Sequence, residues 1–384
     1  MIMQHSVPGK NQLINELLHY PLSFTNKMLN DLIRFGLSFS DIRECIRKIY
    51  DLSESQLTRI SNANSGLLGF LNRRSTSKRT KRFNRRIKKL QSQDKYIIIY
   101  AEGDSWLQFP VFVRDIIDWL TQNKKYLIYS EAYGGDWITN IVYESQYIPS
   151  LSVFRPGYFL ISGGGNDLIG NNRLTIMIHK DYNQPKYQDS SSIQDPSLTQ
   201  YQKEMIMKAQ NHITKEFYAI LWAIKAQYLL LFRGIYSSGS TQKDIITITQ
   251  GYDYAIPGIK AEWPVLHPVQ SFVNKMLDNG CWLERPLKIR GIFDKDLQKA
   301  LVLTFIYELN QIFISIATDP GFENIYHVDC RNLANMKSWY DELHYKSSVF
   351  RKVACAYEFI IENHGKCSKV LKVPDIVKGF TNNT

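Results

Sequence analysis

The sequence predicts an α/β protein with a single parallel sheet of five strands and helices on both faces of that sheet. Five short runs of β-branched and aromatic residues support this class, because such runs are typical of strands buried on both faces. Segments with helical character separate the runs, and this alternation favours parallel strands joined by crossover helices. The chain of 384 residues is long enough for one such domain and an additional module.

The predicted strands begin with Tyr-Ile-Ile-Ile-Tyr-Ala at 96–101, and the other four are 126–129, 158–162, 245–249 and 325–328. Helices are predicted at 110–122, 136–145, 199–233, 268–278 and 295–317. The segment 180–198 is rich in Asp, Ser and Pro, so we expect it to be a polar insertion on the surface. The α/β domain is therefore expected to occupy residues 95–384.

Residues 1–94 are expected to form a helical, basic N-terminal extension. The pairs Asp41/Glu44 and Ser53/Gln56 have the spacing of capping boxes, in which two side chains satisfy free N–H groups where a helix begins. Apolar residues recur with a roughly helical period at Ile42, Ile46, Ile49, Leu57, Ile60 and Leu67.

The formal net charge of +11 is concentrated in one segment of this extension. Residues 73–89 hold ten Lys and Arg residues and no acidic residue, so the rest of the chain is close to neutral. The first interpretation is a solvated face or linker without a partner. If the segment does have a partner, we prefer an anionic membrane surface to nucleic acid.

Cysteine usage and the N-terminus predict a cytoplasmic protein. The five residues Cys45, Cys281, Cys330, Cys355 and Cys367 are odd in number and form no C-x-x-C pair, so we expect reduced thiols. Residues 1–24 lack the apolar core of a secretory signal, although export by a dedicated apparatus stays open. The apolar stretch 217–232 is short for a membrane span and contains Lys225, so a buried helix is expected.

Two short glycine-containing motifs follow the first two predicted strands, at the sheet edge where ligands of open parallel sheets bind. Gly103-Asp104-Ser105-Trp106 follows the first strand, and a Ser at such a turn exposes its Oγ and directs its own N–H toward an oxyanion. An ordinary N-cap Ser would fit the same pattern. Gly134-Gly135-Asp136 follows the second strand, where glycine lets a backbone N–H approach a substrate or simply makes a turn.

Two further motifs follow later strands. Ser162-Gly163-Gly164-Gly165-Asn166-Asp167 offers the Asn166 amide as an oxyanion donor, and it matches neither G-x-x-x-x-G-K-[ST] nor G-x-G-x-x-G phosphate loops. Asp341-Glu342-Leu343-His344 puts an acid and a His three residues apart, so both can lie on one turn. His344 would take the Ser105 proton while Asp341 orients the imidazole, although a surface turn fits this motif alone.

In order, strand context and residue type, the four motifs resemble the blocks of the SGNH (GDSL) hydrolases, a family of serine esterases and lipases. The resemblance covers about residues 95–364, and the stretches 250–254 and 280–283 are similar to those of a bacterial branch. It implies a flavodoxin-like three-layer α/β/α fold and ester hydrolysis through an acyl-enzyme. Tyr345 stands where many members have Pro; because Pro there shapes only the turn, we expect this departure to leave the mechanism unchanged.

The resemblance implies a catalytic triad of Ser105, His344 and Asp341, with Asp329 as the alternative acid. It implies an oxyanion hole made by the N–H groups of Ser105 and Gly135 and the Asn166 amide, with Gly134 as the alternative glycine. No metal or other cofactor is expected. Four histidines outside the motifs are expected to be structural or solvated: His179, His212, His267 and His327.

The expected substrate is a small-molecule or lipid ester. Residues beside the motifs could form an apolar acyl pocket or a platform for sugar rings: Trp106, Tyr133, Trp137, Leu168, Ile169, Tyr254 and Trp282. Two other functions stay open. One is a catalytically silent SGNH domain that binds an acylated ligand, with the basic module on membrane or nucleic acid. The other is a nucleic-acid-binding protein with an accessory hydrolase domain. The intact set of motif residues favours an enzyme.

Overall fold

The computed structural model describes residues 9–53, 56, 66–88, 96–109, 113–169, 172–237, 240, 242–259 and 281–381. Its centre is one all-parallel sheet with the strand order β2-β1-β3-β4-β5-β6. The strands are β1 (Ile97–Glu102), β2 (Tyr126–Ser130), β3 (Tyr158–Ile161), β4 (Ile246–Gln250), β5 (Ile325–Asp329) and β6 (Val370–Lys372). The α/β class and the parallel sheet are confirmed, and the predicted number of five strands is wrong.

The sixth strand was missed because it is short. β6 has three residues and pairs with β5 over His327–Val370, Val328–Leu371 and Asp329–Lys372. A three-residue edge strand has too few positions to show the long apolar run of a central strand. The five predicted strands correspond to β1 through β5.

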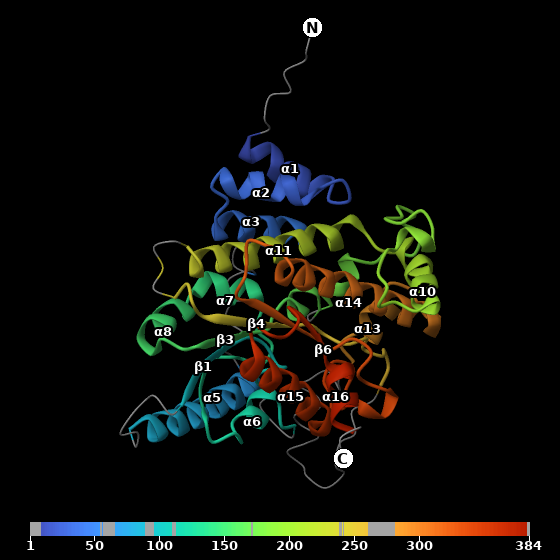
Figure 1. Cartoon of the computed structure of the whole chain (residues 1–384). Coiled ribbons are helices and arrows are strands. Elements are labelled where there is room, and N and C mark those ends of the chain that lie inside the picture. The colour runs from blue at the N-terminus through green and yellow to red at the C-terminus, as the bar shows by residue number, and fades with distance from the viewer. Residues whose placement is uncertain are drawn as a thin grey trace.

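Helices cover both faces of the sheet (Figure 1). One face carries α5 (Gly66–Ile87), α6 (Ile116–Leu120), α15 (Ser347–Asn363) and α16 (Val373–Thr381). The other face carries α7 (Ile138–Glu144), α11 (Lys215–Ile235) and α14 (Lys295–Ala317). The α/β part also contains the described helices α8 (Tyr147–Phe154), α9 (Gly165–Leu168), α10 (Gln200–Gln210) and α13 (Glu284–Ile289). The apolar residues of all these layers join one continuous core.

Several predicted helices differ from the observed ones. The predicted helix 199–233 is two helices, α10 and α11, because the chain turns at Asn211–Thr214, where Ile213 forms an isolated bridge with Ile178. The predicted helix 110–122 is the short α6, and residues 110–112 lie outside the described residues, as does the whole predicted helix 268–278. The predicted helix 295–317 is confirmed as α14.

The N-terminal residues stack outside the α11 layer (Figure 1). Three helices, α1 (Lys10–His19), α2 (Asn26–Arg34) and α3 (Phe39–Ile49), form this additional layer. The Phe24 ring contacts Trp222 of α11 at 5.2 Å, and the Trp222 indole donates to the Pro21 carbonyl at 2.9 Å. The N-terminal helices therefore pack directly on the α/β part of the chain, and the boundary predicted at 94/95 lies outside the described residues.

One of the two predicted capping boxes is wrong. α3 begins at Phe39, so its box pairs Ser38 with Asp41 instead of Asp41 with Glu44. The bonds predicted for the Ser53/Gln56 pair are present, with the Ser53 N–H donating to Oε1 of Gln56 at 2.8 Å and the Gln56 N–H donating to Oγ of Ser53 at 3.2 Å. Leu57 and Ile60 lie outside the described residues, and so does the side chain of Leu67.

Most of the basic segment 73–89 is α5, a helix packed on the sheet; Lys89 lies outside the described residues. The Phe83 ring packs against Tyr129 at 5.3 Å, and Arg79 is buried in an ion pair with Asp115 at 2.6 Å. The outward face exposes cations at Arg74, Lys78, Lys81 and Arg85. α5 is thus a component of the α/β fold with one solvated basic face.

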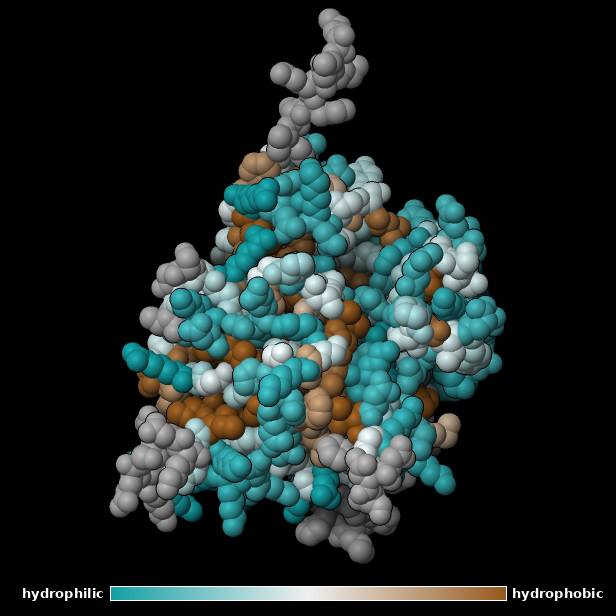
Figure 2. Space-filling view, viewed as in Figure 1, coloured by the Kyte–Doolittle hydropathy of each residue, from teal (hydrophilic) through white to brown (hydrophobic). Residues whose placement is uncertain are grey.

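The molecule has a mixed surface and a strongly apolar interior. Polar residues cover most of the face in Figure 2, and hydrophobic residues show between them at the level of the sheet. Among the described helices, α14 is the one long and apolar enough to cross a membrane. Most of that helix is buried against the rest of the fold, which is how core helices of soluble proteins are placed.

Candidate active site

The strand order puts a topological switch point between β1 and β3, where ligands of open parallel sheets bind. β1 ends at Glu102 and leads into Gly103, which has φ +149°. A Cβ at Gly103 would lie 2.5 Å from both the carbonyl oxygen and the hydroxyl of Ser162, so glycine is required at this close approach. The turn that carries Ser105 is therefore pressed against the end of β3.

Asp104 fixes the conformation of this turn. Its Oδ1 accepts a hydrogen bond from the Ser162 hydroxyl at 2.8 Å and one from the Trp106 N–H at 3.1 Å. Its other carboxylate oxygen accepts from the hydroxyl of Tyr252, which follows β4. Ends of three strands thus hold the residue before Ser105, and the Ser105 side chain is left partly exposed.

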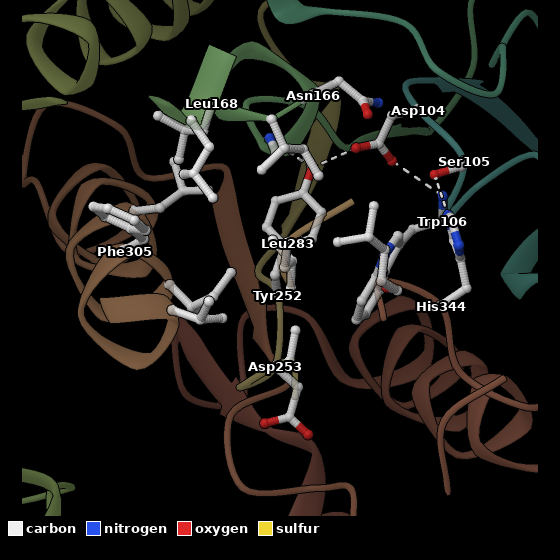
Figure 3. A pocket seen from close by; sticks show the side chains of 18 residues that line it. Asp104, Ser105, Trp106, Asn166, Leu168, Tyr252, Asp253, Leu283, Phe305 and His344 are labelled. Carbon is white, nitrogen blue, oxygen red and sulfur yellow. Dashed lines mark hydrogen bonds between the residues drawn. The ribbon is translucent and has the colours of Figure 1, made fainter. Parts of the chain in front are cut away.

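Ser105, His344 and Asp341 form a continuous hydrogen-bonded chain, of which Figure 3 shows the Ser105 and His344 side chains. Nε2 of His344 lies 2.7 Å from Oγ of Ser105. Nδ1 of the same ring lies 2.9 Å from each carboxylate oxygen of Asp341. With Nδ1 protonated toward Asp341, Nε2 is free to accept the Ser105 proton, which is the arrangement a serine nucleophile needs.

The loop that holds His344 is fixed on several sides. Oδ1 of Asp341 accepts the backbone N–H groups of Leu343 and His344, both at 2.8 Å. The Trp106 indole donates to the Leu343 carbonyl at 3.1 Å, and the Phe109 ring lies 4.5 Å from the imidazole. These contacts restrict both the loop and the ring, so the imidazole is held in place before any substrate binds.

Tyr345 makes contacts beyond the turn after His344. Its buried ring lies 4.8 Å from that of Trp106, and its hydroxyl donates to Asp253 at 2.7 Å. Asp329, the alternative acid, is instead paired with the guanidinium of Arg331 at 2.8 Å. These contacts favour Asp341 as the partner of the imidazole.

The predicted oxyanion donors lie on the neighbouring loops. Gly135 has φ +90°, and Asn166 lies in the first turn of α9, where its Nδ2 donates to the Asp136 carbonyl at 2.9 Å. Figure 3 shows Asn166 at the same end of the pocket as Ser105. The Gly134 N–H already donates to Oδ1 of Asn72 at 3.1 Å, so Gly135 is the better placed of the two glycines.

Buried carboxyl groups surround these loops. Burial raises the pKa of Asp136 to about 7, against hydrogen bonds from the Trp137 N–H and the Asn140 amide. Burial also raises the pKa of Asp167 to about 6; this side chain accepts the Ile138 N–H at 2.9 Å and so ties the start of α7 to α9. The site therefore takes up protons more readily than free carboxylates would.

A pocket with an empty volume of about 620 Å³, its open mouth included, leads away from Ser105 and His344. Trp106, Leu168 and Ile169 line it as predicted. Other lining residues were not predicted: Leu174, Leu283, Val302, Phe305, Ile306 and Leu309. The last four recur at helical spacing on α14, but that helix is apolar on nearly every side, so its sequence singles out no face.

Four residues predicted for the pocket do not line it: Tyr133, Trp137, Tyr254 and Trp282. Trp137 is buried, and Cζ of the Arg173 guanidinium lies 3.6 Å from the centroid of its ring. The Tyr133 hydroxyl donates to the Gly69 carbonyl at 3.2 Å. Aromatic residues beside a motif thus serve the packing of neighbouring helices as readily as they line a pocket.

Histidines outside the motifs are placed away from the triad. His327 is buried on β5 with Nδ1 2.9 Å from the Thr249 hydroxyl, and burial lowers its pKa to about 4. His179 is exposed, His212 is half-buried, and His267 lies outside the described residues. In the part of the chain that the structure describes, no group of three or more His, Cys, Asp or Glu side chains could hold a metal ion.

No protein-family model and no curated protein sequence matches this chain. The chemical interpretation of the site therefore depends on its own geometry. A partly exposed serine, an imidazole within hydrogen-bond distance and a buried carboxylate behind it open onto an apolar pocket.

Proposed function

We propose that this chain is a serine hydrolase of the SGNH (GDSL) type that cleaves carboxylic esters. The observation that carries the proposal is the chain of hydrogen bonds from Oγ of Ser105 through the His344 ring to Asp341. Strand order 2-1-3-4-5 for the first five strands supports the flavodoxin-like three-layer fold expected for such an enzyme. A catalytically silent domain that only binds an acylated ligand would not need these three side chains to be hydrogen-bonded to one another.

The reaction begins when Oγ of Ser105 attacks the ester carbonyl carbon and its proton moves to Nε2 of His344. The carbonyl oxygen gains the negative charge, which the N–H groups of Ser105 and Gly135 and the Asn166 amide would stabilise. The bond to the leaving oxygen breaks, and the leaving alkoxide takes the proton from His344. Water then attacks the acyl-enzyme, gives its proton to His344, and Ser105 leaves with that proton while the carboxylic acid departs.

The test is hydrolysis of p-nitrophenyl esters by the wild type, Ser105→Ala and His344→Ala. We expect kcat to fall by about 10⁴-fold or more in both variants. Ser237→Ala and His179→Ala are matched controls on exposed residues and should retain wild-type rates. A Ser105→Ala variant as active as wild type would exclude this nucleophile.

A fluorophosphonate probe separates a silent domain from an enzyme with a narrow substrate range. Oγ of Ser105 attacks the phosphorus, the O–P bond forms, the P–F bond breaks, and His344 receives the proton. Labelling of the wild type but not of Ser105→Ala is expected. An unlabelled, folded wild type that hydrolyses none of the esters would favour the silent acyl-binding domain.

We also propose a cytoplasmic location and an anionic membrane surface as a partner. The five cysteines form no disulfide with one another, which suits the reducing cytoplasm. The exposed cations of α5 suit an anionic membrane surface better than nucleic acid if the substrate is a lipid ester. Binding to vesicles with and without anionic lipid, beside binding to duplex DNA, tests both partners.

A further inference from the structure

The candidate pocket has two ends of opposite character. Ser105 and His344 lie at one side of it, and Leu168 and Phe305 lie at the opposite side (Figure 3). Val302, Phe305, Ile306 and Leu309 present one continuous face of α14, because residues three and four apart lie on the same side of a helix. Leu174, in the 3-10 helix Arg173–Ile176, and Leu283, directly before α13, complete the wall.

Polar atoms near the apolar end are already bonded within the protein. The Tyr252 hydroxyl donates to Asp104, and Asp253 accepts from Tyr345 at 2.7 Å and from the Ala334 N–H at 2.8 Å. Figure 3 shows the Asp253 carboxylate directed away from the apolar side chains. A sugar or other polar acyl group would lose hydrogen bonds to water here and gain few in return.

We infer that the site takes esters or thioesters with an unbranched apolar acyl chain of medium length, in preference to acetyl or sugar-acid groups. This inference rests on the proposed function. Val302 to Leu309 span about 10 Å at 1.5 Å per residue, so this wall can contact up to about eight carbons of an extended chain. The acyl carbonyl lies at Ser105, and the chain lies against α14.

The dependence on chain length follows from the area buried. Each methylene that moves from water into an apolar wall favours binding by about fourfold. We therefore expect kcat/KM for p-nitrophenyl esters to rise from acetate through butyrate to octanoate, and to level off or fall at palmitate, whose chain exceeds the wall.

Ile306→Trp tests the wall directly. Ile306 is half-buried on the pocket face, and an indole there fills the space of the distal carbons. The octanoate-to-acetate ratio of kcat/KM should fall at least about tenfold, and the preferred chain should shorten. Ile314→Trp, on the same helix and also half-buried, does not line the pocket and should keep the wild-type ratio.

Binding to Ser105→Ala separates this inference from catalysis. Quenching of tryptophan fluorescence, with Trp106 on the pocket wall, reports methyl octanoate and methyl acetate without any chemistry. If the wild type hydrolyses no ester, the proposed hydrolase activity is contradicted. The acyl site is still supported in that case if Ser105→Ala binds methyl octanoate in preference to methyl acetate and Ser105→Ala/Ile306→Trp loses this preference. A flat chain-length profile in both assays, or an unchanged ratio in Ile306→Trp, would overturn the acyl site.

A second observation concerns Asn72, which is fully buried on α5, outside the region that resembles a hydrolase. Its Nδ2 donates to the Gly134 carbonyl at 2.9 Å, and its Oδ1 accepts the Gly134 N–H at 3.1 Å. The Asn72 carbonyl accepts from the Gln108 amide at 3.3 Å, so the same residue is also tied to the loop after Ser105.

The geometry points to Asn72 as a positioning residue for the oxyanion loop. The Gly134 carbonyl belongs to the same planar peptide unit as the Gly135 N–H, so the bond from Nδ2 of Asn72 fixes the orientation of that unit, while the bond from the Gly134 N–H fixes the unit before it. The direction of the Gly135 N–H is thereby set from the N-terminal helix. Positioned donors act mainly on the transition state, so their loss lowers kcat more than it raises KM.

Asn72→Ala removes both bonds, and Asn72→Asp keeps the acceptor alone. We expect kcat to fall about 10–100-fold in Asn72→Ala and less in Asn72→Asp, with KM changed less than about threefold. Fluorophosphonate labelling should slow in the same order, because its phosphoryl oxygen occupies the oxyanion position. Arg86→Ala is the matched control: it removes bonds from α5 to the Tyr126 and Lys124 carbonyls, away from the loop.

Equal losses of activity in Asn72→Ala and Arg86→Ala, or a loss that appears in KM alone, would reduce Asn72 to a structural role and overturn the assignment. If Asn72→Ala does not fold, the comparison of Asn72→Asp with Arg86→Ala decides the matter. If no ester is hydrolysed, the labelling rates carry the same test, so a failed substrate search does not decide it.

Discussion

The two ends of the pocket are built on different physical principles. At the catalytic end each side chain is held by directed hydrogen bonds, as when Asp341 accepts three N–H groups from Leu343 and His344. At the apolar end α14 supplies a wall by packing alone. Direction and distance matter at the first end, and volume matters at the second, so equally small substitutions should have very different consequences.

The largest effect on this comparison is expected from Asp341→Asn. An Asn at this position can still accept the two backbone N–H groups, but its amide favours the wrong tautomer of His344, so kcat should fall about 10³–10⁴-fold with the fold intact. Asp189→Asn is a matched control, because Asp189 also accepts N–H groups two and three residues ahead. Ester kinetics and melting temperature check both variants, and a loss below about tenfold would point to another acid.

A smaller effect is expected from Asn166→Asp, which keeps the size of the side chain and removes its donor. The developing oxyanion would lose one hydrogen bond and gain a neighbouring carboxylate, so kcat should fall at least about 10²–10³-fold while KM changes little. Asn324→Asp removes a comparable bond to the Lys243 carbonyl far from the pocket and should leave kcat unchanged. Unaltered kcat in Asn166→Asp would exclude Asn166 from the oxyanion hole.

At the apolar end, Phe305→Leu should lower the activity far less. The change keeps an apolar side chain and shortens the wall, so kcat/KM for octanoate should fall only about two- to tenfold. Phe313→Leu, on the same helix but packed on Tyr228 at 5.2 Å, should lower the melting temperature without changing chain-length preference. A loss in Phe305→Leu as large as that in Asp341→Asn would contradict the difference between the two ends.

The smallest effect is a pH dependence of stability from Asp136. Its folded pKa of about 7 lies above the ordinary value of 3.8, so the folded state binds this proton more tightly than the unfolded state. Its contribution therefore disfavours folding increasingly as pH rises from about 4 through 7. Asp136→Asn removes this pH dependence. The melting temperature of the variant minus that of the wild type should therefore increase by about 2–4 °C from pH 5 to pH 8.

A constant difference between Asp136→Asn and wild type at pH 5 and pH 8 would contradict this assignment. Asp189→Asn serves again as the control, since Asp189 is exposed and hydrogen bonds from Ser191 and Ser192 hold its pKa below the ordinary value. Thermal denaturation followed by circular dichroism at several pH values is sufficient.

Local patterns in the sequence predicted the catalytic end well. Ser105 and His344 lie in short motifs placed by strand ends, and the sheet topology brings them together. The bond between Asn72 and Gly134 joins residues 62 positions apart and leaves no local pattern, so it was not predicted. The wall on α14 was missed because Phe305 is one of many apolar residues on a helix buried on most sides.

The basic segment shows the same limit. Its composition indicated a solvated face or tether, whereas Arg79 is buried and paired with Asp115. Charge alone does not reveal which cation of a run has an acidic partner elsewhere in the chain. The packing of α5 on β2 determines which cation is paired, and this packing is a property of the tertiary structure.

The N-terminal layer also constrains how the chain is made. α1 to α3 bury Leu13, Leu17, Leu29 and Leu32 in a layer that packs on α11, which leaves the ribosome more than 160 residues after α3. At about 5–20 residues per second that delay is roughly 10–30 s. During that delay the apolar faces with which α1, α2 and α3 pack on α11 lack this partner, although α1 can contact α2 and α3. Weakening α11 should therefore reduce the yield of folded chains through aggregation during synthesis before it alters the chemistry of the mature protein.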